Sequence, residues 1–224
     1  MRRFLAATIL AASTALASCS GVDQVTTGAI PSFDPMTTVV RVSLPGGAHG
    51  SGFHVGGGII ITAAHVVRGY VVGSIEWEDG GRREGTMLWE TALYDVGAIQ
   101  VADAPTAAAN IECRNPGIGE KLTAYGNPGG DNFLAIPATV VGKPRPRAPN
   151  WQTVVPLSLG AQGGISGGPV FDADGDVVGI VVGAPIALLS RSLDPQGIED
   201  YDLSNTGVAY MVPGSVLCSV LGMV

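Results

Sequence analysis

Short apolar runs rich in β-branched residues, each ended by glycine or proline, follow one another through most of this chain. The 224 residues include 33 glycines and 15 prolines, which favour tight turns between strands. We find no internal repeat, heptad pattern or long amphipathic helix in the sequence. The pattern therefore predicts an all-β fold. The expected strands are residues 38–44, 50–55, 59–63, 70–77 and 96–102 in a first half, and residues 121–125, 133–141, 152–157, 169–171, 177–182 and 207–212 in a second half.

The composition excludes several classes of protein. Hydrophobic residues make up 46% and charged residues 14% of the chain, which is too apolar for a disordered protein. The formal net charge of −7 argues against nucleic-acid binding, because that function needs a basic surface. The length suffices for one large or two small hydrophobic cores. A globular protein remains as the expected class.

Residues 1–18 carry the features of an export signal. Arg2 and Arg3 precede an apolar stretch over residues 4–17, which is shorter than the roughly 18 residues that a membrane span needs. Leu16-Ala17-Ser18-Cys19 resembles a bacterial lipobox, in which the cysteine becomes the lipidated first residue. We therefore expect a lipoprotein signal peptide over residues 1–18. An ordinary export signal followed by an incidental cysteine is the alternative.

The lipobox resemblance implies an exported protein anchored to a bacterial membrane through lipid on Cys19. Several acyl chains on one residue suffice for stable anchoring. Ser20, rather than aspartate, after the cysteine favours the outer membrane, facing the periplasm, if the host is Gram-negative. Residues 19–36 contain small polar residues and two prolines, which predicts a flexible tether.

A serine surrounded by glycines is the strongest candidate for chemistry. Ser166 lies in Gly163-Gly164-Ile165-Ser166-Gly167-Gly168-Pro169, where the backbone can turn sharply and bring N–H groups close to a reacting carbonyl. A serine hydroxyl is a poor nucleophile unless a base lies beside it. His65, at the end of an apolar run in Ile61-Thr62-Ala63-Ala64-His65-Val66-Val67, is the candidate base. Asp95, which opens the apolar run 96–99, is the candidate acid.

Other aspartates and histidines compete for these roles. Asp79 lies in a segment of turn composition, and Asp103 follows a strand, whereas Asp95 alone opens an apolar run. His49 and His54 are expected to be a loop residue and a strand residue. No cysteine or acid stands beside them at the spacing of a zinc site, so we expect no metal ion and no cofactor.

The order histidine, aspartate, serine, and the motifs around each residue, resemble the chymotrypsin/trypsin-like serine protease family. The resemblance covers about residues 38–215 and is closest to bacterial trypsin-like and HtrA-like protease domains, whose Gly-Asn-Pro turn is similar to Gly126-Asn127-Pro128. It implies two six-stranded antiparallel Greek-key β-barrels with the active site in the cleft between them. We assign residues 37–110 to the N-terminal barrel and 111–224 to the C-terminal barrel, joined through residues 104–115.

The resemblance also implies roles for these residues in a serine endopeptidase. Ser166 would attack the peptide carbonyl to form an acyl-enzyme, His65 would take and return the proton, and Asp95 would orient His65. The N–H groups of Gly164 and Ser166 would form the oxyanion hole. Ile165 stands where animal enzymes of the family carry an aspartate that pairs with a newly released amino terminus, so we expect no activation of that kind. The last expected strand ends near residue 212, and we expect no peptide-binding (PDZ) domain after it.

The specificity pocket is expected to accept small or aliphatic side chains. In the family, its floor lies six residues before the nucleophile, and this position is Gly160, next to Ala161. The wall would come from Val182, Gly183 and Ala184, again without an acid. A buried lysine ammonium would have no partner there, which is unfavourable. Protein or peptide substrates are the expected partners.

Two cysteines remain if Cys19 is lipidated. Cys113 and Cys218 would form a disulfide in an exported protein, where such pairs usually oxidise. Lys143-Pro144-Arg145-Pro146-Arg147 is expected to be a solvated loop, with a site for an anionic partner as the alternative. The aspartates of Asp172-Ala173-Asp174-Gly175-Asp176 lack the downstream residues of a calcium loop, so a turn is expected.

Two other functions remain open. A binding or scaffold protein could keep the protease fold without turnover, and an esterase could use the same three residues. The α/β-hydrolase type of esterase is disfavoured, because its histidine comes last in the chain.

Overall fold

A computed structural model of the chain describes residues 33–70, 72–184, 186–193, 199–205 and 207–223. The predicted signal peptide, lipidated Cys19 and most of the predicted tether lie outside these residues. Within them, no helix is both long enough and apolar enough to cross a membrane. The end of the predicted tether is described from Phe33 and includes a 3₁₀ turn over Pro35–Thr38.

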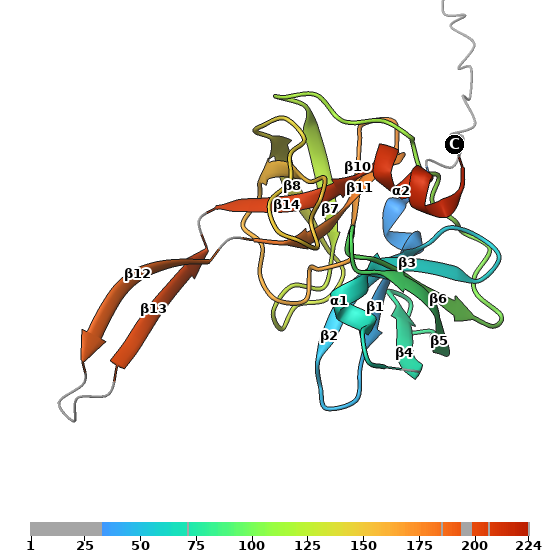
Figure 1. The fold of residues 1–224 in the computed structure, drawn as a ribbon. Coiled ribbons are helices and arrows are strands. Elements are labelled where there is room, and N and C mark those ends of the chain that lie inside the picture. Colours follow the sequence, from blue (N-terminus) through green and yellow to red (C-terminus); the bar gives the residue numbers. More distant parts are fainter. Residues whose placement is uncertain (1–32, 71, 185, 194–198, 206, 224) are drawn as a thin grey trace, which may run out of the picture. The chain divides into compact units, whose positions relative to one another are not determined.

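Six antiparallel strands close into a first barrel (Figure 1). Their order around the barrel is β1-β2-β3-β6-β5-β4, and the pairing of Val40 in β1 with Trp77 in β4 completes the ring. Closure leaves neither β1 nor β4 with an unpaired edge. The strands are β1 (Val39–Ser43), β2 (His49–His54), β3 (Ile59–Ala63), β4 (Val72–Trp77), β5 (Arg82–Thr91) and β6 (Val96–Val101).

Six further antiparallel strands close into a second barrel in the order β10-β11-β14-β9-β8-β7. The pairing of Val170 in β10 with Ala124 in β7 completes this ring. The two closed six-stranded barrels confirm the predicted fold class. The strands are β7 (Lys121–Gly126), β8 (Leu134–Val140), β9 (Val155–Ser158), β10 (Pro169–Phe171), β11 (Val177–Gly183) and β14 (Val208–Pro213).

Three elements were not expected from the sequence. Strand β5 is one of them, and it pairs with both β4 and β6 although its first three residues are exposed. The second is a separate two-stranded sheet formed by β12 (Ile186–Leu193) and β13 (Glu199–Asn205), which lies between β11 and β14 in the chain. The third is helix α2 (Gly214–Leu221), which starts directly after β14 and packs against β11.

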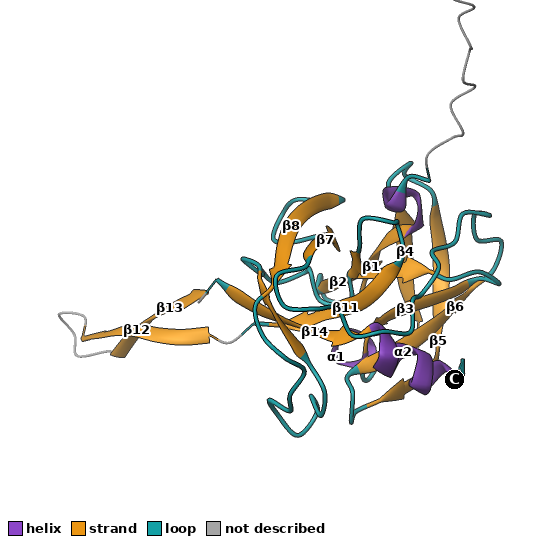
Figure 2. Ribbon diagram, turned by 90° about the horizontal axis from the view of Figure 1, so that it is seen from above, coloured by secondary structure: helices purple, strands orange, loops and turns teal. Residues whose placement is uncertain are grey.

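The barrels share an apolar core. One buried cluster combines Phe53 and Ile60 of the first barrel with Phe171 and Ile180 of the second. Strands β3 and β11, one from each barrel, contact each other (Figure 2). A second cluster, which includes Leu157, fills the interior of the second barrel. The junction of the barrels is therefore packed, which fixes residues of one barrel against residues of the other.

A disulfide joins helix α2 to the segment that connects the barrels. Cys113 and Cys218 are bonded, with their Cα atoms 5.5 Å apart and a sequence separation of 105. On the chain-entropy description, closing a loop of this size restricts the unfolded chain strongly. The bridge therefore ties the C-terminal helix to the start of the second barrel.

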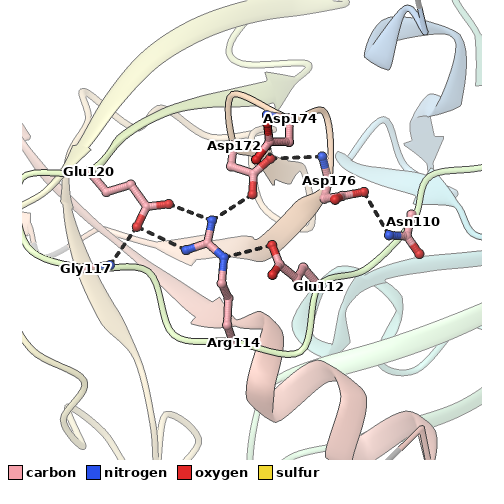
Figure 3. A network of polar contacts seen from close by, with 8 residues as sticks. All are labelled: Asn110, Glu112, Arg114, Gly117, Glu120, Asp172, Asp174 and Asp176. Atoms are coloured by element: carbon pink, nitrogen blue, oxygen red, sulfur yellow. Dashed lines mark hydrogen bonds and ion pairs between the residues drawn. The ribbon is translucent and has the colours of Figure 1, made fainter.

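Next to this disulfide, Arg114 binds three carboxylates at once (Figure 3). Its guanidinium lies 2.7 Å from Glu120 and 2.7 Å from Asp172, and its Nε lies 2.9 Å from Glu112. Asp172 is almost fully buried, whereas Glu112 is about half-exposed. Because Asp172 belongs to the turn between β10 and β11, Arg114 fixes the connecting segment to the second barrel.

The charges of this network are stabilised by their partners. The hydrogen bonds from Arg114 lower the pKa of Glu120, against the effect of burial, and the three carboxylates raise the pKa of Arg114. Burial raises the pKa of Asp172, but hydrogen bonds from Arg114 and from the backbone N–H groups of Asp176 and Asp174 outweigh it, so its pKa is lowered. The ion pairs of Arg114 with Glu120 and with Asp172 are therefore present at neutral pH.

Candidate active site

Asp95 lies immediately before β6, with its side chain only 1% exposed. Its φ is +57°, in the left-handed region that few residues other than glycine adopt. The backbone carbonyl of Asp95 accepts a hydrogen bond of 3.1 Å from the N–H of Ala64, the first residue of helix α1 (Ala64–Val67). This bond holds the acid against the short helix that carries His65.

His65 makes two hydrogen bonds to the Asp95 carboxylate. Its backbone N–H donates to Oδ1 at 2.9 Å, and its Nδ1 lies 2.7 Å from Oδ2. A carboxylate oxygen can only accept, so Nδ1 carries the proton and Nε2 is the free, basic nitrogen. The His65 side chain is 40% exposed, and no described residue is hydrogen-bonded to Nε2. A buried acid thus orients an imidazole that a substrate can reach.

Ser166 lies in the turn before β10, in the second barrel. Its backbone carbonyl accepts a hydrogen bond of 2.8 Å from the N–H of Ser51 in β2. The buried hydroxyl of Ser51 donates to the carbonyl of Gly164 at 2.7 Å and accepts from the N–H of Asn127 at 2.8 Å. Ser51 therefore holds both sides of the Ser166 turn against the first barrel.

Close backbone contacts place this turn beside His65. A Cβ atom on Gly50 would lie 2.6 Å from Val66 and 3.1 Å from the carbonyl of Ser166, so only glycine fits between them. Gly167, with φ +85°, packs against Thr62 at the end of β3, the strand that leads into α1. The structure thus brings the three predicted residues together at the junction of the barrels.

Two backbone N–H groups beside Ser166 have no acceptor. Among the described residues, neither the N–H of Gly164 nor that of Ser166 donates a hydrogen bond. The neighbouring carbonyl of Gly163 is occupied, because it accepts the N–H of Gly129 at 2.7 Å. Two free N–H groups beside a serine are able to bind a negatively charged oxygen.

The conformation of Gly164 explains why a glycine occurs there. Its φ is +100°, and a Cβ atom would collide with the carbonyl of Asn127 and with Nε2 of His49. Nε2 of His49 in turn donates to the Asn127 carbonyl at 3.0 Å. His49, expected to be a loop residue, therefore begins β2 and packs beside the two free N–H groups.

The hydroxyl of Ser166 is free. No described residue is hydrogen-bonded to its Oγ, and this includes Nε2 of His65. Such a contact is often long in a free enzyme and tightens when substrate binds.

The residues predicted to line a specificity pocket do not share one environment. Gly160 is exposed, and a Cβ atom there would meet nothing within 4 Å. Ala161 is half-buried against the core of the second barrel. Val182 is buried in the cluster that crosses the junction, while Gly183 ends β11 and Ala184 follows it, both half-buried.

Sequence reasoning missed two residues of the site. Ser51 was read only as part of a strand, and its hydroxyl is useful only because Gly164 comes close to it. Trp151 lies in the loop between β8 and β9, and its Nε1 donates to Oδ2 of Asp95 at 3.0 Å. No local pattern indicates this contact, because Trp151 is 56 residues from Asp95 and in the other half of the chain.

His54 and the aspartate turn have structural partners. Nδ1 of His54 lies 2.6 Å from the carbonyl of Ala107, and its Nε2 accepts the N–H of Gly58 at 3.2 Å. Asp172 Oδ1 accepts two backbone N–H groups of its own turn. Within the part of the chain that the structure describes, no three His, Cys, Asp or Glu residues are grouped as a metal site would require.

Several curated proteins are similar to this chain in sequence. Serine protease Rv3671c of Mycobacterium tuberculosis (strain H37Rv) is 29% identical over 149 residues, which are 61% of this chain and 36% of that protein. Periplasmic serine endoprotease DegP of Escherichia coli (strain K12) is 23% identical over 164 residues, which are 71% of this chain and 32% of that protein. The chain thus spans about a third of the length of these relatives.

Solved structures share the fold. The crystal structure of Rv3671c protease, inactive form, has a TM-score of 0.68 at 22% identity and covers 84% of this chain and 89% of that chain. The HtrA-type protease AlgWS227A with tripeptide has a TM-score of 0.69 at 16% identity, covering 84% and 59% respectively. The sequence model of the trypsin-like peptidase domain matches residues 50–180, which is more than half of the chain. This chain therefore belongs to the trypsin-like peptidase domain family.

Proposed function

We propose that this protein is a serine endopeptidase that hydrolyses peptide bonds through an acyl-enzyme on Ser166. The observation that carries the proposal is the pair of His65 and Asp95, 2.7 Å apart, next to the Ser166 turn. The acid is buried and the imidazole exposed, so the base is fixed in orientation yet accessible. The relatives named as serine proteases support the same activity.

The reaction would follow the geometry of these groups. Ser166 Oγ attacks the carbonyl carbon of the peptide while its proton moves to Nε2 of His65, and Asp95 stabilises the imidazolium that forms. The N–H groups of Gly164 and Ser166 bind the oxyanion, and loss of one such donor typically costs about 3 kcal/mol of transition-state stabilisation. The proton on His65 then passes to the leaving amine, and water attacks the ester with His65 again as the base.

Activity in this proposal needs no newly released amino terminus. Ile165, directly before the nucleophile, has an apolar side chain that is 1% exposed in the core of the second barrel. Such a side chain cannot pair with an ammonium group. Among the described residues, the N–H groups of Gly164 and Ser166 already have no acceptor, with no cleavage inside the domain. We therefore expect the mature protein to be active without cleavage inside the domain.

Substrate preference in this proposal is for small or aliphatic residues before the cleaved bond. Gly160, Ala161 and Gly183 bring no carboxylate to the predicted pocket, so a lysine or arginine would be unpaired. Discrimination among aliphatic residues is expected to be weak, because each methylene is worth only about 1–3 kcal/mol. Cleavage-site profiling in a mixed peptide library tests this. A majority of cuts after lysine or arginine would overturn the pocket assignment and leave the triad intact.

We also propose export and membrane attachment through Cys19. The support is the lipobox-like Leu16-Ala17-Ser18-Cys19 and the similarity to DegP of Escherichia coli, which is named a periplasmic serine endoprotease. Labelled palmitate should enter the wild-type protein and not Cys19→Ala. Equal incorporation into both proteins would rule the attachment out.

Labelling with a fluorophosphonate probe tests the enzymatic proposal. The mature protein should bind one probe molecule on Ser166, and Ser166→Ala should bind none. Ser158→Ala is a matched control, because Ser158 is an exposed serine in the neighbouring strand β9. A folded wild-type protein that does not react, or a Ser166→Ala variant that does, would contradict the proposal. The first result would favour a scaffold protein that keeps the fold without turnover.

A further inference from the structure

Trp151 connects the second barrel to the acid of the candidate triad. Its indole N–H donates to Oδ2 of Asp95 at 3.0 Å, the same oxygen that accepts Nδ1 of His65 at 2.7 Å. The Asp95 side chain is 1% exposed, so little water is available to replace a lost donor. A hydrogen bond to a buried charged group contributes more than one between neutral groups.

The loop around Trp151 is built to hold the ring in this position. Ala148 and Trp151 form a β-bridge with each other, and Arg145 and Val154 form a second bridge that closes the base of the loop. Next to the indole, the N–H of Gln152 donates to the carbonyl of Leu93 at 3.4 Å, a long bond that reaches the segment just before Asp95. The loop thus docks on the first barrel at two adjacent points.

The indole ring also contacts strands β11 and β14 of the second barrel. A Cβ atom on Gly183 would lie 2.8 Å from the ring, so the backbone of β11 passes directly against it. The ring of Tyr210 in β14 lies 5.8 Å from the Trp151 ring, and the guanidinium of Arg147 lies 5.7 Å from the Tyr210 ring on the side of the same loop. These contacts leave the indole few orientations, and one of them directs its N–H to Asp95.

We infer that Trp151 is a positioning residue, which fixes the Asp95 carboxylate so that His65 keeps the orientation needed for proton transfer. This inference rests on the proposed function, because it assigns Asp95 the role of orienting acid. His65 and Asp95 both belong to the first barrel, whereas Ser166 belongs to the second. Trp151 is the direct side-chain link from the second barrel to the acid, and it therefore helps to align the pair with the nucleophile.

Trp151→Phe is the test variant, since phenylalanine keeps one aromatic ring and removes the N–H donor together with the volume of the second, fused ring. The control below loses the same volume. We expect kcat for peptide hydrolysis to fall about tenfold, the size expected for loss of one hydrogen bond to a charged group. KM should change less than about twofold, because substrate binding does not use this donor. The matched control is Trp77→Phe, since the buried Nε1 of Trp77 has no hydrogen-bond partner. That variant should keep kcat.

An NMR measurement provides a readout that needs no turnover. In the ¹⁵N-labelled Ser166→Ala protein, the indole N–H cross-peak that disappears on Trp151→Phe should lie downfield of the Trp77 cross-peak. It should move when Asp95→Asn is added, while the Trp77 cross-peak should stay in place. Because this protein lacks the nucleophile, the result is independent of whether the chain is a peptidase.

The two proposals can therefore fail separately. An unreactive wild-type protein whose Trp151 cross-peak responds to Asp95→Asn would remove the enzymatic proposal and keep the Trp151–Asp95 bond. If the wild-type protein is active and Trp151→Phe keeps full kcat, the positioning role is overturned. It is also overturned if the Trp151 cross-peak does not move in Asp95→Asn. A kcat loss equal in Trp77→Phe and Trp151→Phe would also overturn it, since both would then act through packing.

Discussion

Asp95 and Asp172 are both buried carboxylates, yet their surroundings differ. The Asp95 side chain is 1% exposed and accepts N–H groups from His65 and from the indole of Trp151. The Asp172 side chain is 4% exposed and accepts two backbone N–H groups and the guanidinium of Arg114. Asp172 is paired with a permanent cation, Arg114. The Asp95 carboxylate, among the described residues, is hydrogen-bonded only to His65 and Trp151, and of these only His65 can become charged.

This difference separates a structural brace from a candidate catalytic group. The ion pair of Arg114 and Asp172 is complete in the resting protein, so it can only stabilise the fold. The partner of Asp95 that can gain charge is His65, and it does so only when it takes a proton. The interaction of the Asp95 carboxylate with His65 is therefore strongest when His65 becomes an imidazolium. A proton-transfer step requires this stabilisation.

The comparison predicts its largest effect for Asp95→Asn. This change should lower kcat/KM for peptide hydrolysis by about 10⁴, because the amide favours the wrong tautomer of His65. The unfolding midpoint should change little, since asparagine has nearly the same volume. Steady-state kinetics and thermal unfolding of the same preparations measure both quantities.

Asp172→Asn is the matched variant for this experiment. It breaks an ion pair with Arg114 and should lower the unfolding midpoint. The value of kcat/KM should stay within about threefold of wild type, because the partners of Asp172 are Arg114 and its own turn rather than the candidate triad. If both variants lost activity equally, the distinction between the two carboxylates would be wrong.

The next largest effect concerns the disulfide beside Arg114. Cys113→Ser with Cys218→Ser should reduce the free energy of unfolding by at most about 4.7 kcal/mol, as expected for a closed loop of roughly 100 residues. Denaturant unfolding measures this. Thiol titration of the unfolded, unreduced mature protein is the independent check, and two reactive thiols would show that no bridge forms.

Local patterns in the sequence were sufficient for most strands of the two barrels, and they singled out the three candidate residues. His65 follows an apolar run and Asp95 precedes one, and these runs become β3 and β6, which pair with each other so that Ala63 lies opposite Val96. The pairing of these strands brings His65 and Asp95 together, so the two sequence motifs predict this contact directly. The local patterns by themselves predict an all-β fold, and the two closed barrels are expected only from the resemblance to the protease family.

Features that depend on distant neighbours escaped this reasoning. Strand β5 carries charged residues on its exposed start and exists because β4 and β6 both offer backbone partners. Trp151 occurs in a loop rich in proline and arginine, where nothing local indicates that Asp95 lies within reach. Only the packing of one barrel on the other creates such a contact.

A smaller effect is expected for Arg114. Arg114→Met should lower the free energy of unfolding by about 2 kcal/mol, because Asp172 would be left buried without its cation, although the guanidinium is itself partly exposed. Urea unfolding measures the change. Arg68→Met is a matched control, since Arg68 pairs with Glu90 at a more exposed position, and it should lower the free energy of unfolding by less than Arg114→Met does. Equal costs for the two variants would show that burial of Asp172 contributes nothing.

The smallest effect is a dependence of stability on acidic pH. Arg114 holds the pKa of Glu120 below its usual range, and the pKa of Asp172 is also lowered. The unfolded chain then binds more protons than the folded one near pH 4, so stability is present above this pH and is lost as the pH falls through the folded pKa values. Denaturant unfolding between about pH 3 and 6 should show a steeper loss in wild type than in Arg114→Met. If the free energy of unfolding fell equally with pH in wild type and in Arg114→Met, the ion pairs of Arg114 would not be the origin of the pH dependence.

Ser166 and His65 act as one catalytic unit only if removing the second residue adds nothing to the loss caused by removing the first. The most direct measurement is kcat/KM for peptide hydrolysis by Ser166→Ala, His65→Ala and the double variant. Each single variant should lose roughly 10⁴ to 10⁶ in rate, and the double variant should have about the same residual rate as either. A double variant whose loss is the product of the two single losses, or a Ser166→Ala protein that retains about a tenth of the wild-type kcat/KM, would contradict the assignment of the triad.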